Sequence, residues 1–103
     1  MTAIAVVTTV GSKKEACAMA HALVDAKLAA CAQISRIESV YAWKGKIESG
    51  KEYRVLFKTT QASYGTVERA IRKLHSYELP AIHAFAFTEI EPAYAQWIDE
   101  NSG

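Results

Sequence analysis

The chain has 103 residues, of which 50% are hydrophobic and 22% are charged, with only five glycines and two prolines. This composition excludes a disordered or collagen-like chain, because it supplies enough apolar surface to offset the entropy of ordering. Its 12 basic and 11 acidic side chains leave a net charge of +1, which argues against a dedicated nucleic-acid binder. The length predicts one domain over residues 1–103.

The uncharged run at the N-terminus, residues 1–12, fits neither a signal peptide nor a membrane span. Lys13 and Lys14 follow the run, whereas a signal peptide carries its positive charges first. The run is also shorter than the roughly 20 residues that span a bilayer. The two cysteines, Cys17 and Cys31, match no zinc or redox spacing. That spacing does not exclude a disulfide, but nothing indicates an oxidising compartment. We therefore expect a reduced, cytoplasmic protein without a membrane partner.

The first predicted elements are a strand and a helix. Residues 2–9 are rich in β-branched side chains, which predicts a buried strand. Ser12 with Glu15 three residues later has the spacing of a capping box, so a helix begins there. Apolar residues recur at helical spacing from Ala16 to Leu28, and the helix should extend to about residue 27.

The middle of the chain predicts a long hairpin. Residues 30–43 contain strand-forming side chains such as Ile34, Val40 and Tyr41. Turn-forming residues follow at 44–46 and again at 48–50. Residues 52–59 then alternate regularly between two faces, with Tyr53, Val55, Phe57 and Thr59 on one of them, which predicts a second strand.

The last part of the chain predicts a helix, a strand and a short helix. Residues 61–74 return to helical spacing. Residues 82–88 predict the fourth strand, and Pro92 suits the first turn of a helix that carries Tyr94, Trp97 and Ile98.

The predicted order is βαββαβ with a short C-terminal helix, an α+β, ferredoxin-like arrangement with an antiparallel sheet. The helices lie on one face of such a sheet. The other face would then carry large apolar side chains, among them Ile37, Tyr41, Trp43 and Leu56 on one choice of register. An uncovered apolar face indicates association with another chain, so we expect an oligomer.

Few residues suggest chemistry. His21, His75 and His83 do not lie at the spacing of a helical metal pair. Residues 8–12 lead from a strand into a helix N-terminus, where free amides could hold an anion. An ordinary capped turn accounts for this segment equally well, and we prefer that interpretation.

The cysteines and His75 each allow a structural and a functional interpretation. Cys31 lies among alanines and suits either a small buried position or a soft ligand for Cu(I). Cys17, on the first helix, suits packing. His75 is expected in the last turn of its helix, where the helix dipole alone favours histidine; a ligand or acid–base role is the alternative.

The same two interpretations apply to Trp43, Lys58 and Trp97. The tryptophans suit core or interface anchors better than stacking platforms. Lys58 lies on the second face of its strand, where a solvated charge is the simpler interpretation than a catalytic one.

Five strings occur in the order typical of one family: Ala29-Ala30-Cys31, residues 39–46 (SVYAWKGK), residues 57–60 (FKTT), residues 74–80 (LHSYELP) and residues 94–98 (YAQWI). Together they resemble the CutA family of divalent-cation tolerance proteins, over about residues 4–98. The resemblance implies a homotrimer whose long hairpins cross between subunits, with an architecture similar to the PII signalling proteins. It also implies a role in tolerance of copper and other divalent metals, and no enzymatic activity is established for the family.

Carried over residue by residue, the resemblance implies Cys31, His75 and Glu78 as metal ligands. The other positions that match the family pattern are Trp43, Lys58, Tyr77, Tyr94 and Trp97. This chain departs from the pattern at three places, with Ser76 and Ala86 where proline is usual and Ala81 where glutamate is usual. Loss of that carboxylate removes a hard oxygen ligand, so a zinc- or manganese-type site there becomes less plausible.

Three hypotheses follow. The first is a homotrimer that binds copper through Cys31 and His75 in response to metal stress. The second is a PII-like signalling or scaffolding trimer that binds a small effector in clefts between subunits, using Lys58, Tyr77 and the 8–12 turn. The third, an enzyme with His75 as general base, has the least support because no second catalytic group accompanies it.

Overall fold

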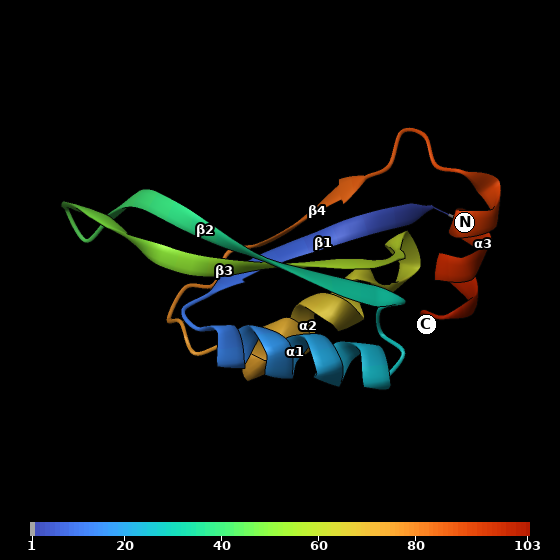
Figure 1. Ribbon diagram of the computed structural model, residues 1–103, viewed down its shortest axis with the longest axis horizontal. Helices are drawn as coiled ribbons and strands as arrows, with labels where there is room; N and C mark the ends of the chain where they lie inside the picture. The colour runs from blue at the N-terminus through green and yellow to red at the C-terminus, as the bar shows by residue number, and fades with distance from the viewer. Residues whose placement is uncertain (1) are drawn as a thin grey trace.

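The computed structural model describes residues 2–103 as a four-stranded antiparallel sheet with the two longer helices packed on one face and the C-terminal helix at one end (Figure 1). In chain order the elements are β1 (Ala3–Val10), α1 (Lys13–Asp25), β2 (Cys31–Trp43), β3 (Lys46–Thr60), a 3₁₀ turn (Gln61–Ser63), α2 (Tyr64–Leu74), β4 (Ile82–Ala86) and α3 (Pro92–Glu100). The strand order is β2-β3-β1-β4, and every neighbouring pair is antiparallel. The predicted α+β, ferredoxin-like arrangement is confirmed.

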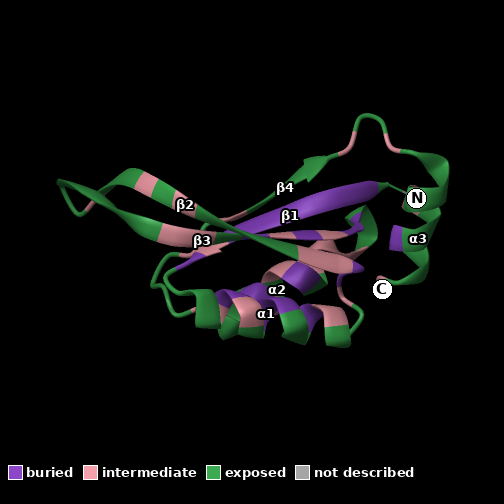
Figure 2. Cartoon of the chain, in the orientation of Figure 1, coloured by how far each residue is buried: buried purple, intermediate pink, exposed green. Residues whose placement is uncertain are grey.

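The core lies between the sheet and the two long helices. Figure 2 shows the buried residues along β1 and on the inner sides of α1 and α2. Val55, Phe57 and Thr59 of β3 are fully buried, which confirms the predicted alternation of that strand. Their partners in the core include Ile4, Val6, Met19, Leu23, Val67 and Ile71.

Helix α1 ends at Asp25, two residues before the predicted end. Lys27 adopts a left-handed conformation with φ of 58°. The Lys27 N–H donates to the Val24 carbonyl at 3.0 Å, and the Leu28 N–H donates to the Leu23 carbonyl at 2.9 Å. These two bonds are those of a Schellman motif, which satisfies the last carbonyls of the helix and reverses the chain.

The structure confirms the first of the two predicted turns, at 44–46, and contradicts the second. Lys44 and Gly45 have φ of 50° and 80° and connect Trp43 to Lys46, a two-residue loop of the kind that joins twisted strands. The second predicted turn, at 48–50, is wrong, because those residues lie inside β3. There they pair with residues 39–41 of β2. The continuous ladder of backbone hydrogen bonds overrides the local preference of serine and glycine for turns.

The far half of the hairpin extends beyond the rest of the sheet. The last pair between β1 and β3 is Val10 with Tyr53, and β2 and β3 continue alone as far as the pair Trp43 with Lys46. Figure 1 shows this two-stranded ribbon projecting from the body. The molecule is correspondingly elongated, with extents of 45 × 26 × 22 Å.

The remaining boundaries need three corrections. The helix predicted over 61–74 begins with a 3₁₀ turn and becomes α-helical at Tyr64. His75 lies one residue beyond α2 in an extended conformation, so the prediction that it occupies the last turn is wrong. Strand β4 ends at Ala86 instead of residue 88, and its last ladder pair joins Ala86 to Ile4 of β1. Pro92 does begin α3, as predicted.

One face of the sheet is not covered by helices. Register places Ile37, Tyr41, Trp43 and Leu56 on this open face, opposite in alternation to Val55. The predicted grouping of these four side chains is thereby confirmed. No helix in residues 2–103 is long and apolar enough to span a membrane.

Candidate functional site

The open face carries the first cluster of candidate residues near α3. Cys31 begins β2 and lies directly opposite Lys58 of β3. Tyr94 of α3 approaches both, since its Oη accepts a hydrogen bond from Lys58 Nζ at 2.9 Å and lies 4.0 Å from Cys31 Sγ. Trp97 stacks on Tyr94 with ring centroids 5.7 Å apart. The structure thus brings together four of the residues named from the sequence.

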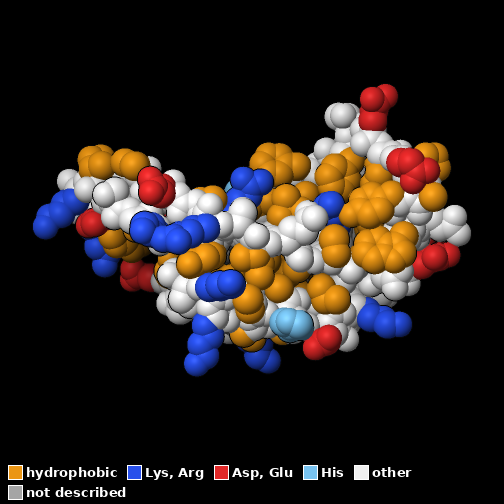
Figure 3. Space-filling model, viewed as in Figure 1, with side chains coloured by type: hydrophobic (Ala, Val, Ile, Leu, Met, Phe, Trp, Pro, Cys, Tyr) orange, Lys and Arg blue, Asp and Glu red, His pale blue; other side chains and the backbone are white. Residues whose placement is uncertain are grey.

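The residues of this cluster are partly exposed to solvent. Trp97 is 41% exposed and Cys31 is half-buried, so neither belongs to the core. The Lys58 ammonium also lies 5.1 Å from the centroid of the Tyr94 ring, a cation–π distance. Lys58 is therefore tied to Tyr94 instead of being freely solvated, a partner that sequence periodicity could not indicate. In Figure 3, hydrophobic side chains gather toward the α3 end, while Lys and Arg side chains stand along the hairpin.

His75 lies at the opposite end of β1, with both ring nitrogens engaged. Its Nδ1 accepts a hydrogen bond from the Tyr77 N–H at 3.1 Å, because an N–H group can only donate. Nε2 therefore carries the proton and donates to the Thr9 carbonyl at 2.8 Å. These two hydrogen bonds hold the segment after α2 against the end of β1. A metal ion would have to displace one of these bonds.

Tyr77 joins the same segment to the hairpin. Its hydroxyl donates to a Glu52 carboxylate oxygen at 2.8 Å. Burial and the hydrogen bond to the Glu52 carboxylate raise the pKa of Tyr77 well above its ordinary value. A Cβ atom on Gly11 would lie 3.3 Å from the Tyr77 hydroxyl, so the 8–12 turn and Tyr77 are close neighbours.

A groove of about 940 Å³ lies between the far half of the hairpin and the segment after α2; we call it the hairpin groove. Tyr41, Trp43, Glu52, Tyr77 and Glu78 are among the side chains that line it. Glu78, predicted as a metal ligand, forms an ion pair with Lys44 at 3.6 Å. Both partners are largely exposed, so the pair contributes little stability.

The three predicted metal ligands do not meet within one chain. Cys31 pairs across the sheet with Lys58, which pairs with Ala5, whereas His75 is bound to Thr9 four residues further along β1. At the rise of a β-strand, that offset is about 13 Å. Among residues 2–103, no three His, Cys, Asp or Glu side chains lie close enough together to hold a metal ion.

Glu15 has a role that the sequence pattern did not indicate. The Ser12 hydroxyl accepts from the Glu15 N–H at 3.1 Å, as the predicted capping box requires. The Glu15 carboxylate instead accepts from the Ser76 N–H at 3.1 Å and from the Ser76 hydroxyl at 3.2 Å. A proline at position 76 could not donate that backbone bond, so this departure from the family pattern has a structural use here. In the sequence, the only indication of this contact is Ser76 at a position where the family usually has proline.

The two other histidines belong to neither cluster, and His83 lies on β4 opposite Val7, on the open face. His83 on β4 packs edge-on against Phe85, with ring centroids 5.2 Å apart. His21 lies on α1 and, with Cys17, lines a groove of about 450 Å³ between α1 and β2, which we call the α1–β2 groove.

Comparison with known proteins gives one consistent result. Residues 4–101 match the family described as CutA1 divalent ion tolerance protein. A divalent-cation tolerance protein CutA from Thermus thermophilus is 35% identical over 95% of this chain and 96% of its own. Protein CutA from Mus musculus is 33% identical over 89% of this chain and 52% of its own.

Solved structures agree with these relatives. The divalent cation tolerance protein Cut A1 from Thermus thermophilus superposes with a TM-score of 0.94 at 34% identity, covering 98% of this chain and 99% of that one. A structure described as the periplasmic divalent cation tolerance protein CutA from Archaeoglobus fulgidus also gives 0.94, at 33% identity over 96% and 97%.

Proposed function

The chain belongs to the CutA1 family of divalent ion tolerance proteins, and we propose that it acts in copper tolerance as a homotrimer that binds copper ions. Family membership agrees with the resemblance drawn from the sequence. One observation supports copper binding in particular. The open face holds the half-buried, reduced thiol of Cys31, and copies of the chain would meet on this face. Thiolate sulfur is a soft ligand suited to copper. Free thiols also suit a reducing compartment, so we place this activity in the cytoplasm.

In the proposed trimer, Cys31 is the first ligand, and His75 and Glu78 come from a neighbouring subunit. Within one chain His75 is about 13 Å from Cys31 along β1. The donors are an imidazole and a carboxylate, which complete a sulfur, nitrogen and oxygen set for copper. Binding would require His75 to exchange its hydrogen bond with Thr9 or with Tyr77 for the metal.

Equilibrium dialysis with Cu(II) and Cu(I) tests the copper proposal. We expect Cys31→Ser and His75→Ala each to weaken stoichiometric binding at the trimer site at least about tenfold, or about 1.4 kcal/mol. His83→Ala serves as the matched histidine control, because His83 lies on β4, packs against Phe85 and is not one of the proposed ligands. Copper binding that Cys31→Ser and His75→Ala leave unchanged would contradict the assignment of these ligands.

The second candidate function is binding of a small organic effector. The hairpin groove favours it, since about 940 Å³ is within the volume range of small-molecule sites and Tyr77 and Lys44 border it. Lys58 was expected to contact the effector, but it lies near α3 and does not line the hairpin groove. A thermal-shift screen with nucleotides and organic acids should then show stabilisation that Lys44→Ala weakens. Absence of any shift across such a set would argue against this function.

A further inference from the structure

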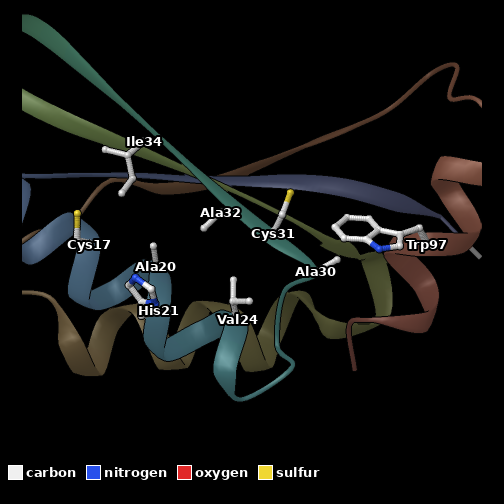
Figure 4. Close-up of a pocket in the computed structure, with 9 residues that line it drawn as sticks. All are labelled: Cys17, Ala20, His21, Val24, Ala30, Cys31, Ala32, Ile34 and Trp97. Carbon is white, nitrogen blue, oxygen red and sulfur yellow. The ribbon is translucent and has the colours of Figure 1, made fainter.

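Two potential metal ligands lie one helical turn apart on α1. Cys17 and His21 are at positions i and i+4, a spacing that places Cβ atoms about 5–6 Å apart on one side of a helix. Both line the α1–β2 groove (Figure 4). Figure 4 also shows that the Cys31 sulfur points away from α1, so Cys31 borders this groove without adding its thiol to the pair.

Both side chains are free to bind a ligand. Within residues 2–103, the structure gives neither of them a hydrogen-bond partner. His75, in contrast, has both ring nitrogens engaged, by Thr9 and by Tyr77. The Cys17 thiol is reduced and half-buried, and His21 is exposed at the mouth of the groove. An ion can therefore enter from solvent and meet a sulfur and an imidazole nitrogen without breaking an existing contact.

We propose that Cys17 and His21 form a binding site for Cu(I), separate from the open-face site. Sulfur and imidazole nitrogen are the donors that a soft ion such as Cu(I) prefers. Zinc sites, whose metal–ligand lengths are about 2.3 Å to sulfur and about 2.0 Å to nitrogen, give the scale: two donor atoms that share one ion must lie within about 4.3 Å of each other. Side chains at positions i and i+4 of a helix reach that separation by rotation.

The surroundings select the kind of ion. The walls of the groove near the pair are apolar, with Ala20, Val24 and Ile34 among them. Such walls disfavour a strongly hydrated dication, whereas Cu(I) is soft and is satisfied by two donors. Zinc sites in proteins use at least three protein ligands, and the described part of the chain offers no such cluster here. On binding, the sulfur–hydrogen bond breaks, its proton passes to solvent, and the sulfur–copper bond forms without any change of oxidation state.

Anaerobic competition for Cu(I) against the chromophoric chelator bathocuproine disulfonate tests this site. The Cys31→Ser protein is the starting point, because it lacks the thiol of the open-face site. We expect it to bind one Cu(I) per chain. Adding Cys17→Ser should abolish that binding, and adding His21→Ala should weaken it at least tenfold. His83→Ala is the matched control and should have no effect.

A second readout detects His21 directly. Adding Cu(I) to the Cys31→Ser protein should shift the NMR resonances of the His21 imidazole and leave those of His83 in place. Absence of Cu(I) binding in the Cys31→Ser protein, or binding that survives both Cys17→Ser and His21→Ala, would overturn the proposal. The two sites are distinguishable, since failure of the open-face site would appear as Cys31→Ser having no effect on wild-type copper binding.

Discussion

At the scale of single residues, hydrogen-bond direction decides what His75 and Tyr77 can do. The Tyr77 backbone N–H fixes the proton of His75 on Nε2, and the Tyr77 hydroxyl donates in turn to Glu52. The segment after α2 is thereby tied to β1 and to the hairpin at the same time. These contacts make His75 a structural group in the single chain, so any metal or proton chemistry there requires the segment to rearrange first.

The raised pKa of Tyr77 predicts a loss of stability at high pH. The ordinary pKa of tyrosine is near 10. The folded state keeps the Tyr77 proton above that pH while the unfolded chain releases it, so the contribution of Tyr77 to stability is complete below pH 10 and declines above it. Denaturant unfolding of wild type and Tyr77→Phe between pH 8 and 11, at one protein concentration, should show a shallower decline for Tyr77→Phe.

Glu52→Gln separates the two main causes of that pKa shift. It removes the negative charge but keeps an acceptor, and burial of Tyr77 remains. The decline of stability with pH should therefore lie between those of wild type and Tyr77→Phe. Equal slopes for all three proteins would show that Tyr77 does not carry the effect.

At the scale of elements, the hairpin shows a competition between local turn preference and strand pairing. Residues 48–50 contain serine and glycine, yet they pair in the ladder with β2. Gly45, not Gly50, has the positive φ that a turn requires. Because the register begins at Trp43 and Lys46, every side chain of the ribbon is assigned to one face or the other by this two-residue loop.

Alanine substitution at these two glycines tests where the turn lies. Gly45→Ala should destabilise the protein by about 1 kcal/mol, because a left-handed conformation costs an alanine that much. Gly50→Ala should be neutral or stabilising by about 0.5 kcal/mol, since glycine weakens a strand and there is open space for a Cβ. Equilibrium denaturation gives both values. A larger loss at Gly50 than at Gly45 would contradict the observed turn.

At the scale of the whole molecule, within residues 2–103, two parts of the sheet are not packed against any other element of the chain. The open face carries large apolar side chains that no helix covers, and the ribbon continues beyond β1 as two strands alone. An isolated two-stranded ribbon is at best marginally stable in water. Packing of ribbons and open faces between copies would satisfy both, which supports the proposed homotrimer.

Sedimentation equilibrium at micromolar concentration tests the assembly. We expect a mass about three times the 11.3 kDa of the chain. Tyr41→Ala and Trp43→Ala should weaken the trimer, because aromatic anchors dominate many interfaces. Leu74→Ala is the control, since Leu74 lies on α2 and is as exposed as Tyr41, at 48%. A mass of one chain, or equal effects of Tyr41→Ala and Leu74→Ala, would contradict this prediction.

Much of the fold is determined by local pattern in the sequence. The alternation of residues 52–59, the cap at Ser12 and the proline at position 92 each predicted an element that the structure contains. These signals are reliable because burial has the period of the element, and caps satisfy backbone groups within a few residues. The five strings typical of the family likewise lie in short segments, so local sequence alone indicates the family.

Tertiary structure alone decided which of the candidate residues meet. Register along β1 separates Cys31 from His75, and it brings Cys31 to Lys58 and Tyr94 instead. The sequence predicted turns at 44–46 and at 48–50, and only the pairing of β2 and β3 over their full length decided that the chain turns at the first and not at the second. The physical reason is that such contacts join segments far apart in the chain, and their geometry depends on strand order and register, which local preference does not encode.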